Sequence, residues 1–115
     1  MAEKELAARL YQAVADDERL RGDLTDAAYA PLLRWCADRA TTLASVPGDL
    51  EELSVALRSA VRSLVAVVET GDHAHLAGID ARVLSAESAS RAARALAAAP
   101  PNPESRAQAL ASALR

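Results

Sequence analysis

The sequence predicts an all-α fold in a single domain spanning residues 1–115. Alanine (29) and leucine (16) dominate the composition, whereas phenylalanine is absent and there are only two tyrosines and one tryptophan. Such a mixture is rich in strong helix formers and poor in the residues that strands favour. Apolar residues also recur at helical spacing along most of the chain. We expect a bundle or orthogonal array of four main helices, followed by a short C-terminal helix, 104–114, after the sequence PPNP.

Charge and cysteine content limit which partners and which cellular compartment are expected for this protein. Residues 1–57 carry 11 acids and 6 bases (−5), and residues 58–115 carry 5 acids and 7 bases (+2), for a net charge of −3. This asymmetry is too mild to predict a nucleic-acid or membrane partner. The single cysteine, Cys36, allows no internal disulfide, and the opening residues contain no apolar leader segment. We therefore expect a cytoplasmic protein, and the strong preference for arginine over lysine is typical of a bacterial coding sequence.

The first half of the chain predicts two helices. One runs from Glu3 to about Arg21 and is ended by Gly22. The next begins near residues 23–26, with Pro31 either inside its first turns or at its true start. In this second helix Trp35 falls about 100° from the centre of the apolar stripe, beside Arg39. Trp35 is therefore predicted either to cover the core or to belong to an association surface.

The clearest element is a helix from Asp49, its expected N-cap, to Thr70, where Gly71 follows as a stop signal. One of its faces is lined by leucine and valine and a second face by small residues, so this helix is predicted to be central and packed on both sides. A third face carries charged residues and is expected to meet water: Glu51, Arg58, Arg62 and Glu69.

The last third of the chain predicts an alanine-rich helix from Ser85 to Ala99, then the terminal helix with Leu110 and Leu114. A helix this short is not stable alone, so the tail must dock on its own domain or on a neighbour. The predicted interface candidates are accordingly Trp35, Arg39, Leu110 and Leu114.

Both histidines lie in one segment, residues 71–84, with the sequence GDHAHLAGIDARVL. His73 and His75, with Asp72 and Glu69, offer metal-ligand chemistry. Side chains two residues apart on a helix point about 200° from each other, however, and the chain contains no helical histidine ligand pair. We therefore expect no metal and no cofactor.

The same segment resembles the turn of a DNA-binding helix-turn-helix motif, but only in part. Glu87 stands where the recognition helix needs an apolar residue, and the segment from Asp80 to Ser90 has two acids against Arg82 alone. The favoured interpretation is a turn between helices, in which Asp72 and Asp80 cap short turns, Leu76 and Ile79 pack inward, and Gly78 permits a bend.

No signature of catalysis is present in the sequence. Cys36 lies in the apolar stripe of its helix, where a thiol behaves as a small hydrophobic group. The leading hypothesis is a non-catalytic, cytoplasmic protein-protein interaction module, either a homodimer or the helical partner of a larger assembly. One alternative is a ligand- or metal-binding domain, with or without enzymatic activity, that uses residues 69–80 with Arg58 and Arg62. A second alternative is a degenerate helix-turn-helix regulator.

Overall fold

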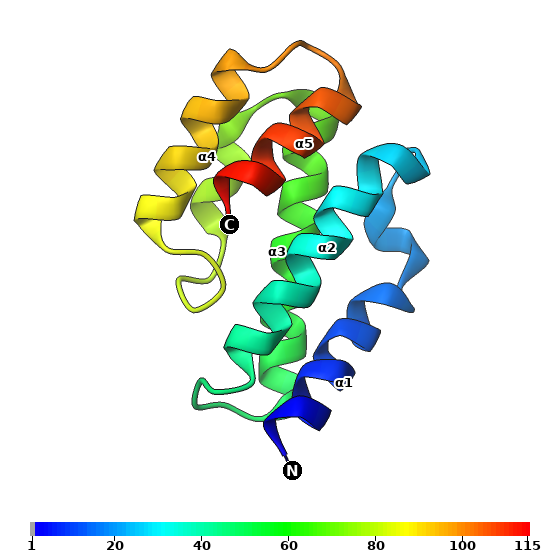
Figure 1. The fold of residues 1–115 in the computed structure, drawn as a ribbon, viewed down its shortest axis with the longest axis vertical. Helices are drawn as coiled ribbons and strands as arrows, with labels where there is room; N and C mark the ends of the chain where they lie inside the picture. The colour runs from blue at the N-terminus through cyan, green and yellow to red at the C-terminus, as the bar shows by residue number, and fades with distance from the viewer. Residues whose placement is uncertain (1) are drawn as a thin grey trace.

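The computed structural model describes residues 2–115 and confirms the all-α fold (Figure 1). Five α-helices and two short 3-10 helices make up the described chain, which contains no strand: α1 (Glu3–Ala15), η1 (Glu18–Arg21), α2 (Asp26–Leu43), α3 (Leu50–Thr70), η2 (His73–Gly78), α4 (Ala86–Ala98) and α5 (Pro103–Ala113). The radius of gyration, 13.2 Å, equals that of a compact domain of this length.

Helix α3 is the centre of the fold, as its two apolar faces predict. The Asp49 carboxylate accepts the Glu52 backbone N–H at 2.7 Å and so caps the first turn. Gly71 ends the helix in the left-handed conformation that glycine favours. Between these caps α3 contacts α1, α2, α5, η1 and η2. The large side chains that it buries are leucines and valines: Leu53, Leu57, Val61, Leu64, Val65, Val67 and Val68.

The terminal helix docks on its own chain. Helix α5 lies beside α2 and α4 (Figure 1) and buries Leu110 and Leu114 completely. Two arginines donate hydrogen bonds to backbone carbonyls near helix ends at this junction. Arg106 of α5 donates to the Val68 carbonyl at the C-terminal end of α3 (2.8 Å), and Arg91 of α4 donates to the Ala113 carbonyl of α5 (3.4 Å). Such bonds satisfy carbonyls that a helix end leaves without an internal partner.

Two local predictions were wrong. The first helix does not continue to Arg21 but ends at Ala15, and η1 begins after Asp17. Consecutive acids follow at that point, and negative charge is unfavourable at a helix C-terminus. Gly78 has no positive φ and open space around it, so it is not required for the bend.

The structure decides between the two alternatives at Pro31. Thr25 accepts the Ala28 N–H as the N-cap of α2, and Pro31 lies inside the helix.

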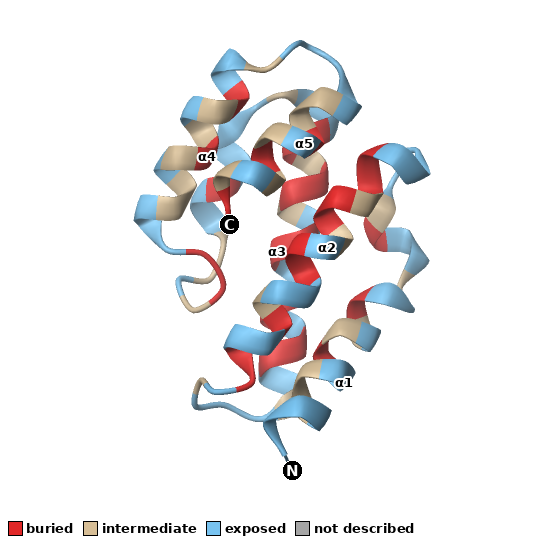
Figure 2. Ribbon diagram, viewed as in Figure 1, coloured by how far each residue is buried: buried red, intermediate tan, exposed pale blue. Residues whose placement is uncertain are grey.

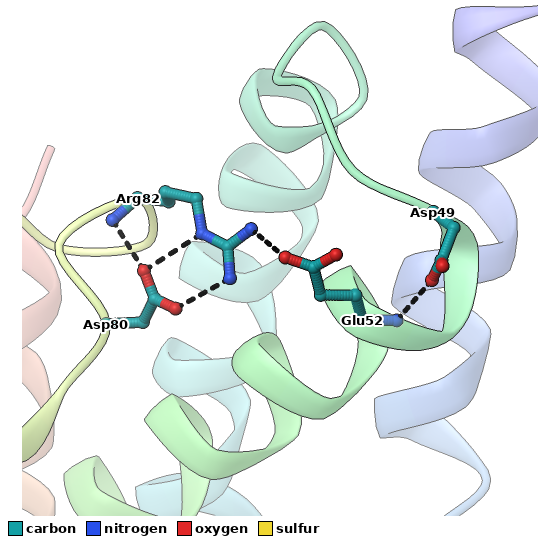
Figure 3. Close-up of polar contacts among 4 residues, drawn as sticks. All are labelled: Asp49, Glu52, Asp80 and Arg82. Atoms are coloured by element: carbon teal, nitrogen blue, oxygen red, sulfur yellow. Dashed lines mark hydrogen bonds and ion pairs between the residues drawn. The ribbon is translucent and has the colours of Figure 1, made fainter.

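A polar cluster joins the loop before α4 to the first turn of α3 (Figure 3). The Asp80 carboxylate accepts the backbone N–H of Arg82 at 2.9 Å and two hydrogen bonds from its guanidinium, at 3.1 and 2.8 Å. The same guanidinium donates to the Glu52 carboxylate at 2.6 Å. These bonds, the side-chain ones above all, hold the pKa of Asp80 below its usual value. The loop is thus fixed while Val83 and Leu84 enter the core.

Buried residues lie on the sides of the helices that face one another, and exposed residues lie on the outer sides (Figure 2). Among residues 2–115, Val55 is the single large apolar side chain that is exposed, at 52%. No helix in this part of the chain is long and apolar enough to cross a membrane.

Gly71, which precedes η2, and Gly78, which ends it, are expected to differ in how much stability a substitution by alanine costs. Gly71→Ala should lower the free energy of unfolding by about 1–2 kcal/mol, because its φ of 76° is unfavourable for a side chain. Gly78→Ala should change it by less than about 0.5 kcal/mol. Urea unfolding followed by circular dichroism measures both. Equal destabilisation by the two substitutions would contradict the assigned conformations.

The lowered pKa of Asp80 predicts a loss of stability in acid. A carboxyl whose pKa is lower in the folded state stabilises the fold above its unfolded pKa, about 3.9, and ceases to do so as pH falls through its folded pKa. The stability difference between wild type and Asp80→Asn should stay constant from about pH 8 to pH 5 and shrink below about pH 4. Parallel acid profiles in a urea series would show that Asp80 makes no such contribution.

Candidate functional site

A groove of about 610 Å³ lies between α2 and the C-terminal part of α5. These two helices run side by side in the fold (Figure 1), and their facing residues form the two walls. The α2 wall consists of Pro31, Arg34, Trp35, Asp38, Arg39 and Thr42. The α5 wall consists of Gln108, Ala111, Ser112, Leu114 and Arg115.

The α2 wall is a continuous helix face. Its residues, from 31 to 42, are related by steps of three and four and occupy about 140° of the helix circumference. At 1.5 Å per residue this wall is about 16 Å long, which is three helical turns. The opposite wall is shorter: Gln108, Ala111 and Ser112 share one side of α5, and Leu114 and Arg115 follow its last residue, Ala113. The groove is therefore bounded by one long helix face and the end of a second helix.

The groove is positively charged. Arg34, Arg39 and Arg115 line it, and none of them has a carboxylate within 4.0 Å among residues 2–115. Asp38 is the one acidic side chain in its walls, so three positive charges less one negative charge leave +2. This balance contrasts with the net −3 of the whole chain.

Trp35 and Arg39 form an aromatic and cationic pair at the α2 wall. Trp35 is only 4% exposed, and the Arg39 guanidinium carbon lies 5.9 Å from the centroid of its ring, which is cation–π distance. The indole Nε1 of Trp35 and the Nε of Arg39 are both covered and have no hydrogen-bond acceptor. A buried donor without a partner costs about 1–3 kcal/mol. The pair therefore retains hydrogen-bonding capacity that the fold itself does not use.

The structure brings together three of the four interface candidates predicted from the sequence. Trp35, Arg39 and Leu114 all line the groove, whereas Leu110 is fully buried in the core. Leu114 is itself 1% exposed, so it forms the floor of the groove. The sequence predictions missed Arg34 and Asp38, which could have been found from their helical spacing with Trp35.

The segment with the two histidines does not form a comparable site. His73 and His75 are exposed, and the Asp72 carboxylate caps η2 by accepting the Ala74 N–H at 2.9 Å. Glu69 accepts the backbone N–H of Asp23 at 3.2 Å. Within residues 2–115 no group of three or more His, Cys, Asp or Glu side chains is placed to hold a metal ion.

The remaining candidates from the sequence are also separate from the groove. Arg58 and Arg62 line neither wall; the Nε of Arg58 is covered without an acceptor, and Arg62 is exposed. The helix-turn-helix spacing is not formed, because a turn occupies residues 81–83 and α4 begins only at Ala86.

Cys36 lies in the core next to the α2 wall and not in the groove. Burial raises the pKa of its thiol to about 12. The reactive thiolate is therefore scarce at neutral pH, and the side chain acts as a small apolar group.

Comparisons of the chain with protein-family models, with curated proteins and with solved structures find no match. Evidence for a function therefore comes from the arrangement of the chain's own residues.

The buried thiol is expected to be silent toward a disulfide reagent such as Ellman's reagent at about pH 8. Both its burial and its raised pKa oppose attack, so the rate of modification should equal the rate at which the protein unfolds, independent of reagent concentration. Denatured protein, as the control, should react at once. A rate proportional to reagent concentration in native buffer would place Cys36 at the surface.

Proposed function

We propose that the protein is a non-catalytic interaction module that holds a helix of a partner protein in the groove between α2 and α5. The observation that supports this function is the lining of the groove by a continuous face of α2, at three- and four-residue spacing, opposite the C-terminal end of α5. A third helix laid in the groove would meet α2 along three turns and residues 108–115 along about two. Recognition of an amphipathic helix in a groove commonly uses this geometry.

The residue types of the walls favour binding. Tryptophan and arginine are enriched among the residues that dominate the affinity of protein interfaces, and Trp35 and Arg39 are adjacent here. The other polar wall residues are hydroxyl, amide, carboxylate and guanidinium groups, which donate or accept hydrogen bonds readily. The groove walls include neither histidine nor cysteine, the side chains most often used as general base and thiol nucleophile.

Self-association, which the sequence favoured, is a special case of this proposal in which a second copy supplies the helix. One reason for it was that the tail with Leu110 and Leu114 needs a surface to pack on, and the structure buries both residues within their own chain. Obligate homodimer interfaces are large and apolar. With Val55 as the one exposed large apolar residue in the described chain, a smaller and more polar association is the favoured version.

A library of helix-forming peptides displayed on phage, with no bias in charge, tests the proposed function. Selected peptides should bind wild type and lose at least about tenfold in affinity toward Ser112→Phe, which fills the groove from the α5 wall. Ser59→Phe, on the exposed side of α3, is the matched control and should bind as wild type does. Peptides that bind both variants equally, or a library without binders, would refute the groove as a helix-binding site.

A further inference from the structure

We infer from the charge of the groove that the helix it holds is acidic, with carboxylates placed to meet Arg34 and Arg39. The inference rests on the proposed function and specifies the partner. It follows from the position of each arginine relative to Trp35.

The groove gathers three arginines that have no carboxylate partner. Arg34, Arg39 and Arg115 lack one within 4.0 Å among residues 2–115, as do some arginines elsewhere, such as Arg58, Arg62 and Arg94. The groove differs in that three such side chains line one hollow. A guanidinium offers five donors in a planar fork that matches a carboxylate in two parallel hydrogen bonds. A partner with carboxylates at these points supplies the acceptors that the chain does not.

The two arginines of α2 stand on opposite borders of its groove face. Arg34 and Arg39 are five residues apart, which separates them by about 140° around the helix, and Trp35 falls between them. Pro31, Asp38 and Thr42 also fall between them, so the middle of the α2 wall carries one carboxylate and its two borders are cationic. A complementary helix has an apolar stripe over Pro31 and Trp35, and Asp or Glu toward Arg34 and Arg39.

A carboxylate near Arg39 would also relieve the two covered donors. In the structure the Arg39 side chain lies over the indole, and neither its Nε nor the Trp35 Nε1 has an acceptor. Rotation of the guanidinium toward an incoming carboxylate gives Arg39 the acceptor that it lacks, and a polar group of the bound helix can supply one to the indole N–H. Because Trp35 is the chain's only tryptophan, its fluorescence reports this change directly.

The test compares two helical peptides that share one apolar stripe and differ only in the flanking residues, glutamate in one and glutamine in the other. Binding is followed by Trp35 fluorescence. The glutamate peptide should bind at least about tenfold more tightly at low salt, and its advantage should fall as ionic strength rises. Arg34→Gln and Arg39→Gln should each weaken the glutamate peptide severalfold and leave the glutamine peptide unchanged. Arg94→Gln, an exposed arginine of α4 outside the groove, is the control and should alter neither.

The outcomes separate the inference from the proposed function. If both peptides bind with equal affinity and both lose it in Ser112→Phe, the groove holds helices without regard to charge, and the acidic partner is refuted while the proposed function stands. If neither peptide binds, or if both bind Ser112→Phe as they bind wild type, the proposed function fails and the inference fails with it. Circular dichroism of each variant verifies that the fold is retained.

Discussion

The burial of the leucine and valine side chains of α3 is the interaction on which the positions of the other helices depend. Helices α1 and α4 each bury only two residues, Leu10 with Val14 and Ala92 with Leu96. Isolated helices of that length are marginal in water, so they are stable only when they pack on something larger. Helix α3 supplies that surface directly to α1, α2 and α5, and α4 is held through its contacts with α5 and η2.

The sequence alone predicted the elements whose ends are set by local chemistry. Asp49 and Gly71 fixed α3 to the residue, and Ser85 caps α4 by accepting the Ser88 N–H. A cap acts within three or four residues of itself, so it can be identified without knowledge of the fold. The predictions failed where a local pattern had more than one physical solution, as at Asp16 and Asp17, where the helical pattern continues but the chain breaks into a 3-10 turn.

The groove could be predicted only in part, because it is made by two helices that are distant in sequence. Trp35 and Arg39 were identified from their angular position on one helix. Which side of α5 faces them depends on how α2 and α5 pack, a tertiary relation that no periodicity contains. Leu110 and Leu114 illustrate the difficulty, because both are apolar and one turn apart, yet only Leu114 lines the groove. The expectation for His73 and His75 needed no tertiary information, because it used only the directions of side chains two residues apart on a helix.

The positive charge of the groove comes from arginine side chains alone, and this limits how pH and lysine modification could affect an association there. All its cations are arginines, whose guanidinium keeps its proton at every pH that a cell experiences. The chain's single lysine, Lys4, lies in α1, so acetylation of lysine leaves the groove unchanged. The charge of the arginines is in this sense independent of pH, so a loss of the proposed complex in mild acid would come from protonation of the partner's carboxylates and not from the groove.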